Sequence, residues 1–340
     1  MLHIAYGMTD RGRRQISRIF LMAAPLVLPG CAGGQSALDP AGREAAEVYD
    51  LFVVMVIGGG VIWLAVIGLL VHACRRRRRT WSEEGAGRLI AWGGVAFPVV
   101  VLIALLAYAV WLMPSIRPWL DRSVPEPAMI DVTGEQFWWR IRYPAEDGMA
   151  AFETANELRL PVGERVAFSL RAADVIHSFW IPSLGGKMDM IPGRTNVLSL
   201  LPTKTGVYQA PCAEFCGASH AYMAFSVIVM DTKAYDDWRR RQAAGNRPGG
   251  SEGERLFAHH GCAGCHSVRG VTPVAGLGPD LTRFSDRRTV GAGALANTPE
   301  NVARFIRNPS AIKPGATMPA FDMLSQGDIA AIAEFLTGRP

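Results

Sequence analysis

Two short runs of the chain carry cysteine, histidine and methionine at spacings that suit metal chemistry. In the first, two thiols, an imidazole and a thioether fall within 12 residues, Cys212-Ala-Glu214-Phe-Cys216-Gly-Ala-Ser-His220-Ala-Tyr-Met223. A Cys212–Cys216 disulfide would suit an exported protein but would leave His220 and Met223 unused. Zinc binds thiolates and imidazoles but has little use for a methionine. Thiolate, imidazole and thioether together on a β scaffold are typical of electron-transfer copper, and two thiolates can bridge two copper ions.

The second run is Cys262-Ala-Gly-Cys265-His266, the attachment signature of a c-type haem. Two cysteines three residues apart can bond both vinyl groups, and the adjacent histidine then lies under the iron. A bare C-x-x-C also occurs in redox dithiols and zinc half-sites, but His266 favours haem. A low-spin carrier needs a sixth ligand, and methionine raises its potential. We expect Met318 to be that ligand, because Pro319 favours an extended loop there; Met323 is the alternative.

The apolar pattern predicts a separate scaffold for each run. Between residues 128 and 230, short apolar or aromatic runs alternate with Pro, Gly and Asp, which is typical of an all-β sandwich or barrel. Five such runs predict strands at 128–133, 137–143, 165–170, 197–201 and 225–230. Residues 241–250 have no apolar face to bury and are predicted to be a flexible linker. A domain at residues 251–340 follows this linker.

Two uncharged runs before the β domain predict a transmembrane hairpin within residues 31–120. Leu51–Val71 has 21 residues and Leu89–Met113 has 25. At about 1.5 Å per residue, either run can cross the roughly 30 Å hydrocarbon layer of a bilayer. We expect helices at about 48–73 and 89–113. The arginines at 75–79 place the intervening loop in the cytoplasm and therefore both later domains outside the cell membrane.

The N-terminus has the layout of a secretory signal peptide over residues 1–30. Arginines at 11, 13, 14 and 18 precede the apolar run Ile19–Leu28, which ends in Leu28-Pro29-Gly30-Cys31. Small residues before a cysteine resemble a bacterial lipoprotein signal. We therefore expect Cys31 to be the lipidated mature N-terminus, with an ordinary signal peptide as the alternative.

Composition and charge suit a membrane-anchored chain and argue against nucleic-acid binding. The chain has 340 residues, of which 49% are hydrophobic, and a net charge of +5. The first 120 residues carry 12 Lys and Arg against 7 Asp and Glu, whereas residues 121–240 carry 12 against 15. The basicity thus belongs to the membrane region, and we predict no nucleic-acid partner.

The first run and its surroundings resemble cytochrome c oxidase subunit II. The resemblance covers roughly residues 45–232 and includes the two membrane spans, the pattern C-x-E-x-C-x-x-x-H-x-x-M, and the segments Gly134–Trp139, Ala173–Gly185 and Lys187–Arg194. It implies a cupredoxin-like Greek-key sandwich at 121–240. Residues 251–336 similarly resemble class I cytochrome c, through Gly278–Leu281, Lys313–Pro319 and Gln326–Leu336, which implies an all-α haem domain.

The resemblance also implies a ligand set for a dinuclear copper centre, called CuA in the family. It makes Cys212 and Cys216 bridging thiolates, His177 and His220 imidazole ligands, Met223 the thioether ligand and Glu214 a ligand through its carbonyl oxygen. The family's counterpart of the Glu214 carboxylate also reaches a magnesium ion shared with subunit I. Phe137 stands where the family usually has the tryptophan that receives electrons, so Phe137, Trp138 and Trp139 are the candidates for that role.

The implied function is that of subunit II of a haem-copper terminal oxidase in a bacterial inner membrane, with the copper and haem domains on the periplasmic side. Electrons would pass from cytochrome c or a cytochrome bc complex through one covalent haem c and two copper ions to subunit I. There oxygen would be reduced to water with proton pumping, in a complex that also contains subunit III. The alternatives are subunit II of a copper-containing nitric oxide reductase and a membrane-tethered electron carrier or copper-delivery protein. A flexible linker would let the haem domain swing.

Overall fold

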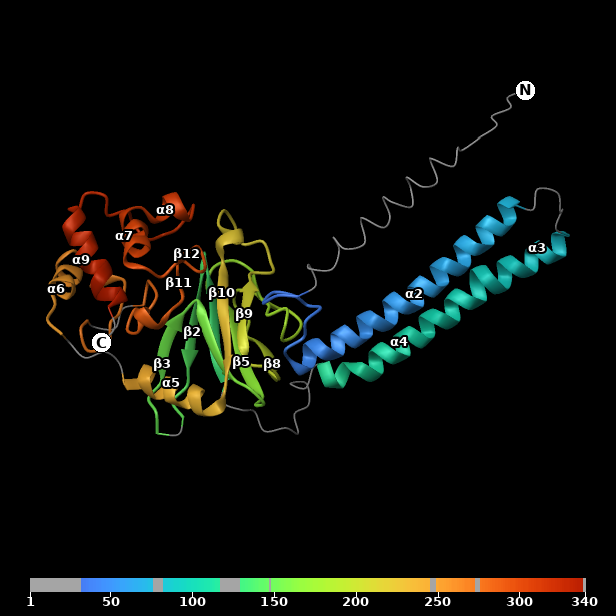
Figure 1. Ribbon diagram of the computed structural model, residues 1–340, viewed down its shortest axis with the longest axis horizontal. Coiled ribbons are helices and arrows are strands. Elements are labelled where there is room, and N and C mark those ends of the chain that lie inside the picture. Colours follow the sequence, from blue (N-terminus) through green and yellow to red (C-terminus); the bar gives the residue numbers. More distant parts are fainter. Residues whose placement is uncertain are drawn as a thin grey trace, which may run out of the picture.

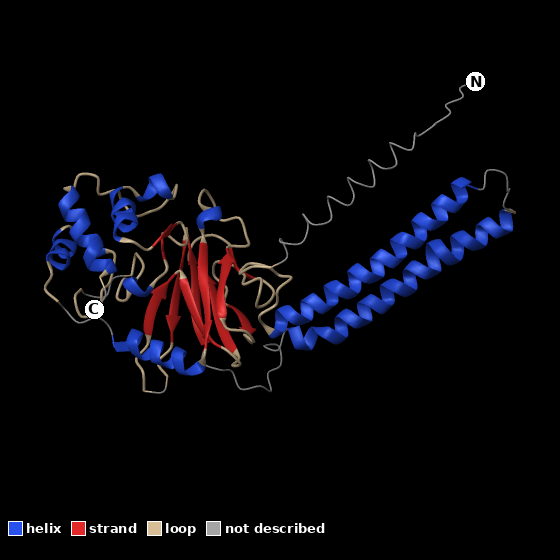
Figure 2. Ribbon diagram, in the orientation of Figure 1, coloured by secondary structure: helices blue, strands red, loops and turns tan. Residues whose placement is uncertain are grey.

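The structure is a computed structural model that describes residues 32–75, 82–116, 129–146, 148–244, 249–272 and 276–338. These residues form a long helical hairpin, a β-sandwich and a helical C-terminal domain, in that order along the chain (Figures 1 and 2). The predicted order of the three parts is therefore confirmed. The predicted signal peptide, residues 1–30, and Cys31 lie outside the described residues.

The hairpin consists of two helical arms that are long and apolar enough to cross a membrane. The first arm is α2 (Arg43–Arg75), and the second is continuous through α3 (Glu83–Leu89), the π-helix η3 (Ile90–Ala96) and α4 (Phe97–Ile116). Ser82 caps the second arm by accepting a hydrogen bond from the Gly85 N–H. Both arms extend beyond the predicted helices at 48–73 and 89–113, because polar first turns precede the apolar runs.

The start of α2 is anchored in the β domain. Glu44 is 1% exposed, and its carboxylate accepts hydrogen bonds from Arg165 Nη1 at 2.7 Å and from the Leu201 N–H at 3.0 Å. Next to it, Gly42 lies against Leu184 so closely that a Cβ atom would be 2.4 Å from the Leu184 carbonyl oxygen. The first membrane helix therefore begins on the surface of the β domain rather than after a loose connection.

The β domain contains two main sheets around one core. The larger has the strand order β3-β2-β1-β5-β8 and the smaller has the order β4-β10-β9. In β1 and β10 alternate side chains are buried, which is the period expected of a strand with one face on a core. The strands are β1 (Met129–Glu135), β2 (Trp138–Tyr143), β3 (Phe152–Ala155), β4 (Glu157–Pro161), β5 (Val166–Ala172), β8 (Asn196–Leu200), β9 (Gly206–Pro211) and β10 (Ala224–Met230), with a hairpin of β6 (His177–Phe179) and β7 (Met188–Met190).

Helix α5 (Thr232–Ala244) follows the sandwich and corrects the predicted linker at 241–250. Its Trp238 is 3% exposed and packs edge-on against Tyr143 and Phe152. Its last turn reaches Gln242, which is buried and donates a hydrogen bond to Asp286 at 2.8 Å. Residues 241–244 are therefore helical. Polar contacts hold this turn, and the lack of an apolar face in this segment gave no sign of them.

The C-terminal domain is built on the crossing of its first and last helices. Gly253 in α6 lies against α9 so closely that a Cβ atom would be 2.0 Å from the Ala331 carbonyl oxygen. Phe257, Ile329 and Ile332 form the buried core beside this crossing. The elements are α6 (Glu252–His259), η6 (Cys262–Gly264), η7 (Phe284–Asp286), β11 (Thr289–Val290), β12 (Leu295–Ala296), α7 (Pro299–Arg307), α8 (Pro309–Ile312) and α9 (Gln326–Thr337).

Candidate metal and haem sites

The Cys212–Met223 run forms a loop between strands β9 and β10. These strands pair antiparallel, which brings the two ends of the loop together. The Cys212 N–H donates a hydrogen bond to the Met223 carbonyl at 2.9 Å and closes the loop. Near its end, residues 220–222 make one 3₁₀ turn, η5. A run that is local in sequence is thereby folded into a compact cluster.

The predicted ligand side chains converge at this loop. Cys212 Sγ lies 3.9 Å from His177 Nδ1, and Cys216 Sγ lies 3.6 Å from His220 Nδ1 and 3.7 Å from Met223 Sδ. The donor atoms of His177, Cys212 and Cys216 are within 4.8 Å of one another. Both cysteines are buried free thiols, so the disulfide alternative is not formed.

Neighbouring groups orient His177 toward the thiols. Its Nε2 donates to Asp174 Oδ1 at 2.8 Å, which leaves Nδ1 facing Cys212. Asp174 is itself held by the backbone N–H groups of Gln136, at 2.6 Å, and of Val175, at 2.7 Å. Although burial raises the pKa of the Asp174 carboxyl, these hydrogen bonds and the one from His177 lower it overall. Asp174 is thus an anionic support for His177 that sequence reasoning did not single out.

The two thiols differ in their electrostatic surroundings. Burial acts to raise the pKa of Cys212, but the hydrogen bond with His177 lowers it overall. Burial and the neighbouring Cys212 raise the pKa of Cys216 to about 12. Two thiols, two imidazoles and the thioether of Met223 form a soft donor set, which fits copper better than zinc.

The haem attachment run forms one tight turn at the start of the C-terminal domain. The N–H groups of Cys265 and His266 both donate to the Cys262 carbonyl, at 3.2 and 3.0 Å. His266 Nδ1 lies 2.9 Å from the Pro279 carbonyl oxygen, which makes Nδ1 the donor and leaves Nε2 free for a metal. Burial lowers the pKa of His266 and so favours the neutral form that binds metals. A Cβ atom on Gly278 would lie 2.6 Å from the His266 ring, so that glycine forms part of its cradle.

The two methionines considered as the sixth haem ligand differ in burial. Met318 is partly buried and packs against the core of the C-terminal domain. Met323 is 74% exposed. The packing therefore favours Met318, and the residues of this domain fit a covalent haem.

The three aromatic candidates for receiving electrons occupy different environments. Trp139 is fully buried and packs against Phe179 and Phe225, with its ring centroid 6.2 Å from that of His177. Trp138 lies beneath the guanidinium group of Arg140. Phe137 is 6% exposed, and Gly315 of the C-terminal domain lies against its ring.

The Glu214 side chain, which the family resemblance linked to magnesium, lies at the protein surface. It is 45% exposed and its carboxylate is 3.6 Å from Lys187 Nζ. Lys187 also pairs with Asp189 at 2.6 Å. The backbone of Glu214 faces the other way, with its carbonyl oxygen 3.3 Å from Cys212 Sγ.

Comparison with known proteins divides the chain in the same way. Residues 144–231 match the family "Cytochrome C oxidase subunit II, periplasmic domain", and residues 250–339 match "Cytochrome c". Cytochrome c oxidase subunit 2 of Alkalihalophilus pseudofirmus is 34% identical over 92% of this chain and 93% of its own length. The Bacillus subtilis protein of that name is 31% identical over 94% and 96%. The crystal structure of the periplasmic domain of subunit II of cytochrome oxidase of Bradyrhizobium japonicum is 31% identical, covers 35% of this chain and 95% of that chain, and has a TM-score of 0.33.

Proposed function

The chain belongs to the cytochrome c oxidase subunit II family, and from this premise we propose that it passes electrons from a periplasmic donor through its own haem c and a dinuclear copper centre to subunit I of a haem-copper oxidase. The observation that carries the proposal is the convergence of five donor side chains in one cluster, in which all but His220 are buried: His177, Cys212, Cys216, His220 and Met223. The enzyme activity belongs to the complex, because oxygen reduction takes place in subunit I.

Each residue of the copper cluster has a role that its contacts support. Cys212 and Cys216 would hold the copper ions through their thiolates, His177 and His220 through Nδ1, Met223 through its thioether and Glu214 through its carbonyl oxygen. Bound copper would supply a centre that accepts and releases one electron. Asp174 holds the His177 ring in place, and burial of both thiols excludes water.

In the haem domain, Cys262 and Cys265 would attach the haem through thioether bonds, and His266 and Met318 would hold the iron. The Pro279 carbonyl fixes the tautomer of His266, and methionine ligation would give the haem a high potential. The domain is therefore suited to receive electrons from cytochrome c or a cytochrome bc complex.

The rest of the chain connects these centres to a membrane complex. Most large apolar side chains of the hairpin are exposed and would face lipid and subunits I and III in the inner membrane. The exposed Glu214 carboxylate is available for a magnesium ion shared with subunit I. Proton pumping coupled to oxygen reduction belongs to subunit I, and Cys31 would add a lipid anchor.

The proposal is tested by metal and haem analysis of the purified oxidase complex. We expect this chain to contribute two copper ions and one haem c, in addition to the metal and haem of subunit I, with a near-infrared band from the copper pair. Cys212→Ser should lose copper and keep haem, whereas Cys74→Ser, which alters an exposed cysteine outside the cluster, should keep both. Copper retained in full by Cys212→Ser would contradict the ligand assignment, and nitric oxide consumption without oxygen consumption would indicate a reductase instead.

A further inference from the structure

Lys313, which the proposed function does not use, is buried where the haem domain meets the copper domain. It is 3% exposed, and its Nζ donates to the carbonyl oxygens of Phe137 at 2.5 Å, Tyr222 at 2.9 Å and Gly291 at 2.8 Å. An ammonium group has three N–H donors, so these carbonyls take all of them. Phe137 and Tyr222 belong to the copper domain, whereas Gly291 belongs to the haem domain.

Around Lys313, the loop that carries Met318 contacts the copper loop directly. Ser219 Oγ in the copper loop donates to the Pro314 carbonyl at 2.6 Å. The Phe137 ring lies between Gly217 of the copper loop and Gly315 of the haem domain, and a Cβ atom on either glycine would be 3.2 Å from it. Gly315 has a φ of +77°, which favours glycine at this point of close approach.

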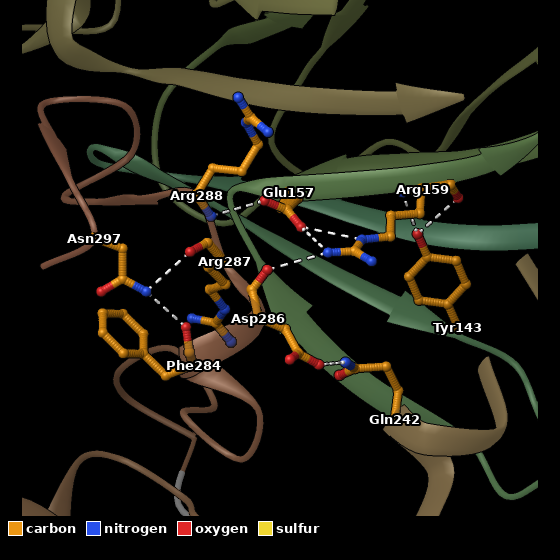
Figure 3. A network of polar contacts seen from close by, with 9 residues as sticks. All are labelled: Tyr143, Glu157, Arg159, Gln242, Phe284, Asp286, Arg287, Arg288 and Asn297. Atoms are coloured by element: carbon orange, nitrogen blue, oxygen red, sulfur yellow. Dashed lines mark hydrogen bonds and ion pairs between the residues drawn. The ribbon is translucent and has the colours of Figure 1, made fainter. Parts of the chain in front are cut away.

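A second group of contacts joins the same two domains through other segments (Figure 3). Arg159 Nη2 of β4 donates to the Asp286 carbonyl at 3.1 Å, and Gln242 of α5 donates to the Asp286 carboxylate at 2.8 Å. Glu157, also in β4, accepts from the Arg288 N–H at 3.0 Å. Because two groups of contacts from different elements hold the haem domain, its orientation is defined as well as its position.

Because the Lys313 amine is buried, each of its N–H groups needs a hydrogen-bond partner within the protein. An ammonium group removed from water needs hydrogen-bond acceptors, and the three carbonyls supply them. Those partners in turn lose their donor if the amine is removed, and a buried carbonyl without a partner is unfavourable. Two of the three lie in the other domain, so Lys313 is satisfied in this way only when the domains are docked.

We propose that Lys313 is a positioning residue that fixes the Met318 loop on the copper loop, so that haem c passes electrons from a docked position instead of swinging on its linker. The inference rests on the proposed function and adds a fixed geometry to it. It also implies that the haem domain shields Phe137, so that an external donor delivers electrons to haem c.

Lysine labelling of the unaltered oxidase complex tests directly whether the haem domain is docked on the copper domain. With an amine-reactive acetylating reagent, Lys313 should react at least about tenfold more slowly than exposed lysines, because reaction requires local opening. Lys233 and Lys204, whose side chains are 88% and 59% exposed, provide the comparison in the same chain. Labelling of Lys313 at the rate of these two lysines would overturn the dock.

A matched pair of variants then tests the role of the amine. Lys313→Met should speed hydrogen exchange in segments 134–140 and 217–224 by at least about threefold, because both faces of the dock open more often. It should also slow electron transfer from haem to copper, with both absorption spectra unchanged. Lys233→Met, at an exposed site, should alter neither property. If Lys313→Met exchanges like Lys233→Met, Lys313 is not the positioning residue.

The possible outcomes distinguish failure of the docked arrangement from failure of the proposed function. Copper and haem are measured in the same preparations, and lack of either group defeats the proposed function regardless of Lys313. Fast Lys313 labelling in a preparation that contains both groups defeats only the dock. If Lys313→Met does not fold, the labelling of the unaltered chain still decides.

Discussion

Replacing Gly134 with alanine is expected to displace the predicted copper ligand His177. A Cβ atom at position 134 would lie 2.8 Å from His177 Cδ2 and 2.9 Å from Cγ. To restore an ordinary contact of 3.4 Å, the ring must move by about 0.6 Å, which exceeds the roughly 0.5 Å tolerance of a preorganised site. The ring is fully buried and held by Asp174, so it has little freedom to move without loss.

The expected result has a spectroscopic part and a stability part. Gly134→Ala should bind less copper and shift the near-infrared and electron paramagnetic resonance spectra of the copper pair. It should also destabilise the β domain by about 1–3 kcal/mol, the usual cost of overpacking a core. Gly186→Ala is the matched control, because a Cβ atom there meets nothing within 4 Å.

Copper content, spectra and urea unfolding of the two variants should be compared in the full-length chain. If Gly134→Ala has the same copper content, spectra and stability as Gly186→Ala, then the His177 ring can move without affecting copper binding or stability. That result would refute the conclusion that the close approach of β1 fixes this ligand.

Three further predictions concern the haem domain and the independence of the two centres. Met318→Ala should lower the haem potential and change the visible spectrum, whereas exposed Met323→Ala should do neither; redox titration decides, and equal potentials would exclude Met318 as ligand. Gly253→Ala should destabilise the haem domain by about 1–3 kcal/mol or more in urea unfolding, because a Cβ atom would be 2.0 Å from Ala331 O. Gly327→Ala in α9 is the control, since a Cβ atom there makes only an ordinary contact with Ser325 at 3.7 Å; equal midpoints would contradict this packing. Chelation of copper should leave the haem spectrum unchanged, since the two donor sets share no residue, and haem loss on chelation would show that they are linked.

The sequence predicted the local parts of the site well and the long-range parts less well. The thiols, His220 and Met223 lie in one run, so their spacing alone indicated a metal site. His177 is far from that run, and only the family resemblance connected it. The hydrogen bond between His177 and Asp174 was missed. The two residues are three positions apart, and that spacing was the one signal for the contact in the sequence.

Strand prediction followed the same division. The five predicted strands correspond to β1, β2, β5, β8 and β10, which carry apolar or alternating runs. Strand β4 was not predicted, because four of its five residues are buried and its apolar and polar residues do not alternate. Strands β6 and β7 have three residues each, too few to show a period.

The domain interface could not be predicted, because its main contacts join a side chain to backbone carbonyls. Lys313 was seen only as part of the loop before Met318. Nothing in the residue types of Phe137, Tyr222 and Gly291 marks their carbonyl oxygens as its partners. The end of α5 was missed for a similar reason, since its partners are distant in sequence: Asp286 accepts a hydrogen bond from Gln242, and Arg269 donates to the Ala243 carbonyl.

The ion pair between Glu44 and Arg165 has a consequence for how the protein stands on its membrane. A helix that emerges rigidly from a domain transmits its own tilt to that domain. The β-sandwich therefore cannot pivot freely above the bilayer, and its height and inclination are set by the first transmembrane segment. A mutation that removed the Glu44 carboxylate would leave every metal ligand in place, yet it would let the β-sandwich change its orientation relative to the first helix.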